Sequence, residues 1–265
     1  MPGFGAPQRG GLAVNKRAIV AESRRPAKTG GATSISAGLP HPLIGAEFVT
    51  GAAEAAQLPP PGVAEIAFAG RSNAGKSSAI NALANRTRLA FASRTPGRTQ
   101  QINLFALRSG TLVADLPGYG YAAVAKSIKR SWQDFLWQYV MTRSSLVALV
   151  LVVDARHGLK DLDLDLLAEF VRSARPVLIL ATKADKLGTT AQRNAVAGVA
   201  AQIRAAFPMG APNVTVQLFS AATRQGVQEA ETMISTWIPP DAWQNGIDAA
   251  DQKKGPAVKG SDAGP

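Results

Sequence analysis

Residues 70–77 read Gly70-Arg71-Ser72-Asn73-Ala74-Gly75-Lys76-Ser77. This run matches the pattern G-x-x-x-x-G-K-[ST], in which glycines let backbone N–H groups turn toward phosphate oxygens. Lys76 is expected to reach the β- and γ-phosphates of a nucleotide, and Ser77 to offer its hydroxyl to Mg²⁺. An apolar stretch at 66–69 precedes the run and a helical pattern follows it. The sequence therefore predicts a phosphate-binding loop between a strand and a helix.

Strands and helices alternate along the rest of the chain. We expect strands at 63–69, 102–107, 111–116, 146–154, 177–181 and 214–219, and helices at 76–85, 127–143, 161–171, 190–207 and 227–237. The short connection at Ser109-Gly110 favours an antiparallel hairpin between the second and third strands. We therefore expect an α/β fold with a mostly parallel six-stranded sheet, one antiparallel strand and helices on both faces.

The two ends of the 265-residue chain differ in composition from its middle. Residues 1–44 are rich in Gly, Ala, Ser, Pro and Arg, and residues 241–265 end in a short basic run and small residues. We expect the first segment to be a disordered basic extension, with His41 exposed to solvent, and the second to be a disordered tail. Residues 45–240 are then expected to form one domain.

Composition limits the classes of function open to the chain. It has no cysteine, which excludes disulfides and cysteine-bound metal. The longest apolar run, 146–153, is too short to cross a bilayer, and the N-terminus lacks the apolar core of a signal peptide. We therefore expect a soluble cytoplasmic protein without membrane contact. The alternative is an organellar matrix protein, because the basic N-terminal segment has the composition of a transit peptide.

The charge balance points to a polyanionic partner. The formal net charge is +11, and nucleic acid is the commonest large polyanion. The alternative is that the cations only keep the tail and the helix faces solvated.

A second motif lies at the end of a predicted strand. In Asp115-Leu116-Pro117-Gly118, the carboxylate can hold Mg²⁺ through water and the last N–H can face a γ-phosphate. Between the phosphate loop and this motif lies a polar loop, Arg94-Thr95-Pro96-Gly97-Arg98-Thr99-Gln100. The hydroxyl of Thr95 or of Thr99 could reach Mg²⁺ and close the loop over the γ-phosphate. Spacing alone does not separate these two candidates.

A third motif reads the base of the nucleotide. Thr182-Lys183-Ala184-Asp185 follows a predicted strand and is similar to the [NT]-K-x-D motif of guanine-nucleotide proteins. Asp185 can accept hydrogen bonds from the N1–H and the amino group of guanine, whereas adenine offers no such pair of donors. Lys183 is expected to lay its stem along the base. Phe219-Ser220-Ala221 ends the next strand, where a backbone N–H would contact guanine O6.

Together these motifs resemble the EngB (YihA/YsxC) GTPases of the TrmE-Era-EngA-EngB-Septin-like class, which are bacterial factors in assembly of the large ribosomal subunit. The resemblance extends from about residue 65 to residue 237 and rests on 70–78, 95–100, 115–121 and 182–185. It implies a Ras-like P-loop GTPase domain that hydrolyses GTP to GDP and phosphate. The implied partners are GTP, GDP and the large ribosomal subunit or its rRNA precursor, with a link to cell division and septation, and the implied state is a monomer.

The resemblance also assigns residues. It makes Thr99 the Mg²⁺ ligand of the polar loop beside Ser77, and it gives catalytic roles to Lys76, Thr99 and Gly118. The remaining nucleotide contacts that it implies are Gly97, Arg98, Gln100, Gln101, Asp115, Leu116, Pro117, Thr182, Lys183, Ala184, Asp185, Phe219, Ser220 and Ala221. Related GTPases with asparagine at the place of Asn73 can bind K⁺ beside the phosphates, so Asn73 is a candidate K⁺ ligand.

Tyr119 stands where many GTPases carry the glutamine that orients the attacking water. Because a phenol cannot orient water as an amide does, we expect slow intrinsic hydrolysis that depends on a partner to order the switch loops. The alternative function is a GTP-gated rRNA-binding module with negligible turnover. A third hypothesis, a P-loop kinase or ATPase, is opposed by Asp185.

Overall fold

The computed structural model describes residues 41–90, 101–120 and 126–240, with the side chains of 126–133 left aside. The strands are β1 (Glu47–Ala52), β2 (Glu65–Gly70), β3 (Ile102–Ala106), β4 (Leu112–Asp115), β5 (Leu146–Asp154), β6 (Val177–Thr182) and β7 (Val214–Leu218). The helices are α1 (Lys76–Leu83), α2 (Lys126–Thr142), α3 (Asp161–Arg172), α4 (Thr189–Ala206) and α5 (Val227–Ser235). Single 3-10 turns lie at Ala55–Gln57 and Ala184–Lys186.

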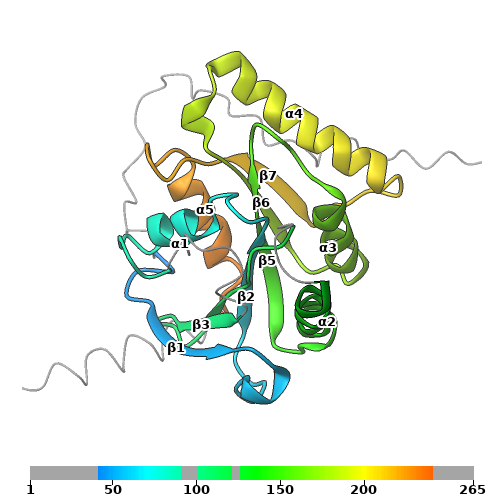
Figure 1. The fold of residues 1–265 in the computed structure, drawn as a ribbon. Coiled ribbons are helices and arrows are strands. Elements are labelled where there is room, and N and C mark those ends of the chain that lie inside the picture. Colours follow the sequence, from blue (N-terminus) through cyan, green and yellow to red (C-terminus); the bar gives the residue numbers. More distant parts are fainter. Residues whose placement is uncertain (1–40, 91–100, 121–125, 241–265) are drawn as a thin grey trace, which may run out of the picture.

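These strands form one sheet in the order β1-β3-β4-β2-β5-β6-β7 (Figure 1). The pairs β4-β2, β2-β5, β5-β6 and β6-β7 are parallel, and β3 runs antiparallel to both of its neighbours. The Ras-like fold with one antiparallel strand is thus confirmed. The five expected helices and six expected strands are all present, and their observed ends differ from the expected ones by at most two residues.

The expected number of strands, six, was wrong because β1 is a seventh strand at the edge of the sheet. β1 pairs only with β3, and its register shifts between Phe48 and Thr50. Its sequence, EFVTGA, lacks a regular apolar alternation, and only Ala52 of the strand is buried. The strand is held by backbone pairing and by an edge-on contact between Phe48 and Phe105, whose ring centroids are 5.9 Å apart. A pattern of buried side chains could not have revealed it.

The core has two layers because side chains of a strand alternate between the faces of the sheet. Along β5, Leu149 and Leu151 pack with the buried side chains of α2, α3 and α4. Val150 and Val152, between and beyond them, pack with those of α1 and α5. Figure 1 shows α1 and α5 on one side of the sheet and α2 and α3 on the other. The carboxyl ends of the parallel strands remain free to form a ligand site.

Residues just before the predicted start of the domain at residue 45 contact α5 and its side of the core. Leu43 is fully buried in the layer that contains α1 and α5. The ring of His41 remains 57% exposed, yet its Nδ1 lies 2.8 Å from Oε2 of the buried Glu231 on α5. His41 is exposed, as the sequence predicts, and its ring also contacts the far end of the chain through Glu231. The partner of His41 is 190 positions away, which local sequence does not indicate.

A buried glutamate joins the start of β2 to α2. Glu65 accepts hydrogen bonds from the hydroxyl of Tyr139 at 2.6 Å, the Nε of Arg143 at 2.9 Å and the hydroxyl of Ser145 at 2.9 Å. Burial and the neighbouring carboxylate raise the pKa of Tyr139 well above its usual value. The hydrogen bond to Glu65 raises the pKa of Arg143. This network lies at the amino end of β2, opposite the end that carries the phosphate loop.

None of the helices in the described ranges is long and apolar enough to cross a membrane. Within the same residues, no group of three or more His, Cys, Asp or Glu side chains is placed to hold a metal ion.

Candidate nucleotide-binding site

The phosphate loop connects the end of β2 to the start of α1, as the sequence predicts. A side chain at Gly70 would put its Cβ 2.4 Å from the carbonyl oxygen of Val152 on β5, so only glycine fits there. Gly75 precedes α1 with φ +100°, a conformation that glycine adopts without strain. The loop therefore packs tightly on the sheet and delivers the N-terminus of α1 to the site.

Lys76 and Asp115 meet at this terminus. Because β4 pairs with β2 in parallel, Asp115 at the end of β4 lies opposite Phe68, next to the loop. The Nζ of Lys76 donates to Oδ1 of Asp115, and the two side chains are only 11% and 7% exposed. Ser77 lies in the first turn of α1, directly after Lys76. Hydroxyl and carboxylate oxygens are the donors that Mg²⁺ prefers, so the residues present here fit this ion.

The turn after β4 lies against the phosphate loop. The N–H of Ser72 donates to the carbonyl of Tyr119 at 2.9 Å. A Cβ at Gly118 would lie 3.1 Å from the Cα of Ser72, which is tighter than nine in ten real Cβ contacts. The backbone of Gly118 therefore reaches the phosphate loop because it carries no side chain.

Tyr119 points into the protein. Its side chain is buried, and its hydroxyl donates to Oδ1 of Asp163 on α3 at 2.6 Å. Burial and the nearby carboxylate raise the pKa of Tyr119 well above its usual value, so the phenol stays protonated. Its ring packs in the core on the side of the sheet that α2 and α3 cover, near Leu136, Trp137 and Leu166.

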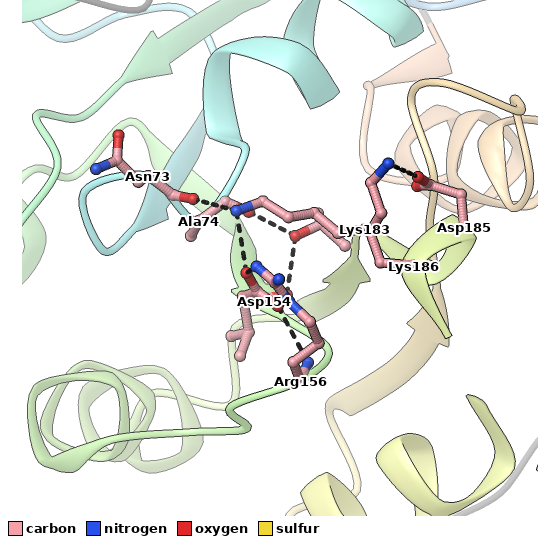
Figure 2. A network of polar contacts seen from close by, with 9 residues as sticks. Asn73, Ala74, Asp154, Arg156, Lys183, Asp185 and Lys186 are labelled. Carbon is pink, nitrogen blue, oxygen red and sulfur yellow. Dashed lines mark hydrogen bonds and ion pairs between the residues drawn. The ribbon is translucent and has the colours of Figure 1, made fainter. Parts of the chain in front are cut away.

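The third motif is tied to the phosphate loop by two side chains. The buried hydroxyl of Thr182 lies within hydrogen-bond distance of the carbonyls of Ala74 and Val153. Lys183 adopts φ 58° and donates from Nζ to the carbonyl of Asn73 at 2.7 Å (Figure 2). These contacts fix the position of the base-reading loop relative to the loop that binds phosphates.

Asp185 is held in its charged form. Its Oδ1 accepts a hydrogen bond from the hydroxyl of Ser220 at 2.7 Å, and Lys186 Nζ lies 3.4 Å from its Oδ2. The hydrogen bond from Ser220 is the main cause of a lowered pKa of Asp185. The N–H of Phe219 donates to the carbonyl of Ala181 at 2.9 Å, which brings the strand end after β7 beside that of β6. The two base-reading segments predicted from the sequence therefore lie together.

One residue of this site was missed. Asp154, the last residue of β5, is bonded to Arg156 at 2.7 Å and lies 3.0 Å from Lys183 Nζ (Figure 2). The hydrogen bond from Arg156 is the main reason why the pKa of Asp154 lies far below its usual value. Asp154 thus pairs with Lys183, whose Nζ also donates to the carbonyl of Asn73 in the phosphate loop. The available signal was its place, a carboxylate that ends an apolar strand at the ligand edge of the sheet.

Part of the predicted site lies outside the described residues. This holds for Thr95 and for four of the predicted contacts, Gly97, Arg98, Thr99 and Gln100. Gln101 is described and lies exposed just before β3. The second hydroxyl ligand for Mg²⁺ therefore remains a prediction.

The fold and these three loops define a P-loop GTPase. A sequence model of the family described as "50S ribosome-binding GTPase" matches residues 65–183. The chain is 49% identical over 197 residues to the "Probable GTP-binding protein EngB" of Azoarcus sp., covering 74% of this chain and 93% of that protein. It is 49% identical over 193 residues to the protein of the same description in Aromatoleum aromaticum, covering 73% and 88%.

The chain belongs to the EngB family of GTP-binding proteins, as the sequence resemblance indicated, and it is a GTP-hydrolysing enzyme. A crystal structure of a probable GTP-binding protein engB has the same fold, with a TM-score of 0.52 at 19% identity. The match covers 66% of this chain and 98% of that one.

Proposed function

We propose that this GTPase acts as a nucleotide-dependent switch in assembly of the large ribosomal subunit, as a monomer in the cytoplasm. The proposal is carried by two pairs, Lys76 with Asp115 and Ser220 with Asp185, on loops that are connected by the bond from Lys183 to the carbonyl of Asn73. The first pair suits a nucleotide triphosphate with Mg²⁺, and the second suits guanine. The ribosomal partner is supported by the description of the matching family and by the net charge of +11, which favours rRNA phosphates. A role in cell division is a further part of this proposal.

The proposed chemistry is attack of water on the γ-phosphorus, with GDP as the leaving group. Lys76 neutralises charge on the β- and γ-phosphate oxygens, and the N–H of Gly118 donates to the γ-phosphate. Ser77, Thr99 and, through water, Asp115 would hold Mg²⁺. The bound ion would offset the negative charge that develops on the leaving diphosphate. Because the hydroxyl of Tyr119 donates to Asp163 in the core, it does not orient the attacking water.

Single-turnover hydrolysis tests the switch. In the presence of purified large-subunit precursor particles we expect the rate constant to rise about tenfold or more, which is about 1.4 kcal/mol of added transition-state stabilisation. The reason is that the protein supplies no amide at the position of Tyr119 to hold the water, so a partner must order the switch loops. Small-subunit particles at equal RNA concentration are the control. A slow rate that particles leave unchanged, together with GTP-dependent particle binding, would instead support the GTP-gated rRNA-binding module.

The proposal includes K⁺ as an activating ion at Asn73. The backbone carbonyl of Asn73 already accepts from Lys183, and its side-chain amide points away from that lysine in Figure 2. The amide oxygen is thus free to act as a ligand for a monovalent cation beside the phosphates, where the ion would act as a fixed positive charge.

Hydrolysis measured in K⁺ and in Na⁺ tests this role. We expect it to be about tenfold faster in K⁺, and we expect Asn73→Gly to remove the difference. Glycine is the matched variant because Asn73 adopts φ 64°, which glycine tolerates while losing the amide. Equal rates in the two salts for the unmutated protein would contradict an activating K⁺.

A further inference from the structure

Tyr119 is bonded to a carboxylate that is itself fixed at the start of α3. Tyr119 is 4% exposed and Asp163 is 0% exposed. Oδ1 of Asp163 accepts a hydrogen bond from the hydroxyl of Tyr119 at 2.6 Å, and Oδ2 accepts one from the backbone N–H of Lys160 at 2.9 Å. The Asp163 N–H in turn donates to the carbonyl of Lys160 at 2.8 Å. Both carboxylate oxygens are thus engaged, and neither can move without leaving a buried group unpaired.

The backbone of the same tyrosine is joined to the phosphate loop. Its carbonyl accepts from Ser72 at 2.9 Å, and its N–H donates to Gly70 across a longer distance of 3.4 Å. The next residue, Gly120, adopts φ +79°, and a Cβ there would lie 3.1 Å from Nε of Arg71. Gly120 therefore also lies close to the phosphate loop. A single residue connects the phosphate loop, the turn after β4 and α3.

We infer that Tyr119 is a positioning residue for GTP, which holds the Gly118 peptide at the phosphate loop through its bond to Asp163 and so sets the preference between GTP and GDP. The inference rests on the proposed contact between the Gly118 N–H and the γ-phosphate. GDP lacks that phosphate, so its binding does not require Gly118 to be fixed. If the Gly118 peptide moves in the free protein, GTP binding must immobilise it, which costs free energy. A peptide that is already held in place removes this cost.

The test compares two tyrosines of the same environment. Tyr139 is 2% exposed and donates to Oε2 of Glu65 at 2.6 Å, a buried tyrosine–carboxylate bond like that of Tyr119 but at the other end of β2. Tyr119→Phe and Tyr139→Phe each remove one hydroxyl and leave the ring. The dissociation constants of GDP and of a non-hydrolysable GTP analogue are measured by calorimetry with Mg²⁺ present, beside the thermal midpoint Tm of each variant.

We expect Tyr119→Phe to weaken binding of the GTP analogue about tenfold while GDP affinity changes less than about twofold. Tyr139→Phe is expected to lower Tm about as much as Tyr119→Phe does, and to leave the ratio of GTP-analogue affinity to GDP affinity unchanged. Asp163→Ala also removes the bond from the Lys160 N–H, but it is expected to lower the same ratio about tenfold. The double variant Tyr119→Phe/Asp163→Ala should lower the ratio no further, because both single changes remove the same Tyr119–Asp163 bond.

Three results would overturn the inference: an unchanged ratio in Tyr119→Phe, an equal change of the ratio in Tyr139→Phe, or additive effects in the double variant. Failure of the proposed function would look different. In that case the unmutated full chain would bind the GTP analogue no better with Mg²⁺ than without it, whatever the variants do.

Discussion

Replacing Asp185 by asparagine is expected to change the preferred nucleotide from GTP to xanthosine triphosphate. In the unmutated protein both acceptor positions toward the base belong to a carboxylate, whose orientation is fixed by the hydroxyl of Ser220 at 2.7 Å. An asparagine keeps one oxygen for Ser220 and turns its NH₂ toward the base, where it meets the donors of guanine. Xanthine carries a carbonyl in place of the amino group and can accept from that NH₂.

The expected loss of GTP affinity follows from the two hydrogen bonds. Each bond to a charged acceptor contributes about 1.5–3 kcal/mol, so losing both weakens GTP binding about 10²- to 10⁴-fold. Competition of the two nucleotides for a fluorescent analogue measures the change. Asp161→Asn is the matched control, because this exposed aspartate lies in the first turn of α3 and should leave the preference unaltered. Tight ATP binding by the unmutated protein would contradict the assignment of guanine.

Local pattern was sufficient for the parts of the site that the backbone makes. The phosphate loop needs glycines at a strand-to-helix turn, and Gly70 and Gly75 occupy the two places where a side chain would clash or strain the backbone. Asp115 ends β4 and Asp185 lies in the turn just after β6, and the carboxyl ends of these strands lie at one edge of the sheet, so order along the chain was enough to place both at that edge. The same argument placed Ser220 beside Asp185.

The contacts that hold these loops in place could not be read from the sequence. The sequence indicates Thr182 only as a nucleotide contact, whereas its hydroxyl faces the carbonyls of Ala74 and Val153. The sequence shows Tyr119 only as a tyrosine at the position where many GTPases carry glutamine, whereas the structure shows its hydroxyl donating to Asp163, 44 positions away. Such pairs depend on which helices pack side by side, and a single sequence carries no periodic signal for them. The edge strand β1 was not predicted for a related reason, since it is held by backbone pairing rather than by burial of its side chains.

The buried network of Glu65 has the same long-range character, and it leads to the largest effect on stability that we expect. Glu65→Gln should lower the free energy of unfolding by about 3–5 kcal/mol, which is the usual cost of removing one partner from a buried ion pair. Glu65 is 0% exposed and accepts both Nε and Nη2 of Arg143. A glutamine removes the negative charge that pairs with Arg143, and its NH₂ replaces one of the two oxygens that accept from Arg143, Tyr139 and Ser145. Total stabilities of about 5–15 kcal/mol make this a large fraction.

Urea unfolding of the full chain, followed by circular dichroism, measures the change. Glu169→Gln is the control, because Glu169 pairs with the exposed Arg172 on the same helix and such pairs contribute about 0.2–0.5 kcal/mol. If both variants unfold at the same urea concentration as the unmutated protein, the bonds around Glu65 contribute nothing to stability. The expected loss would instead show that β2, which carries the phosphate loop at its far end, depends on α2 for its anchoring.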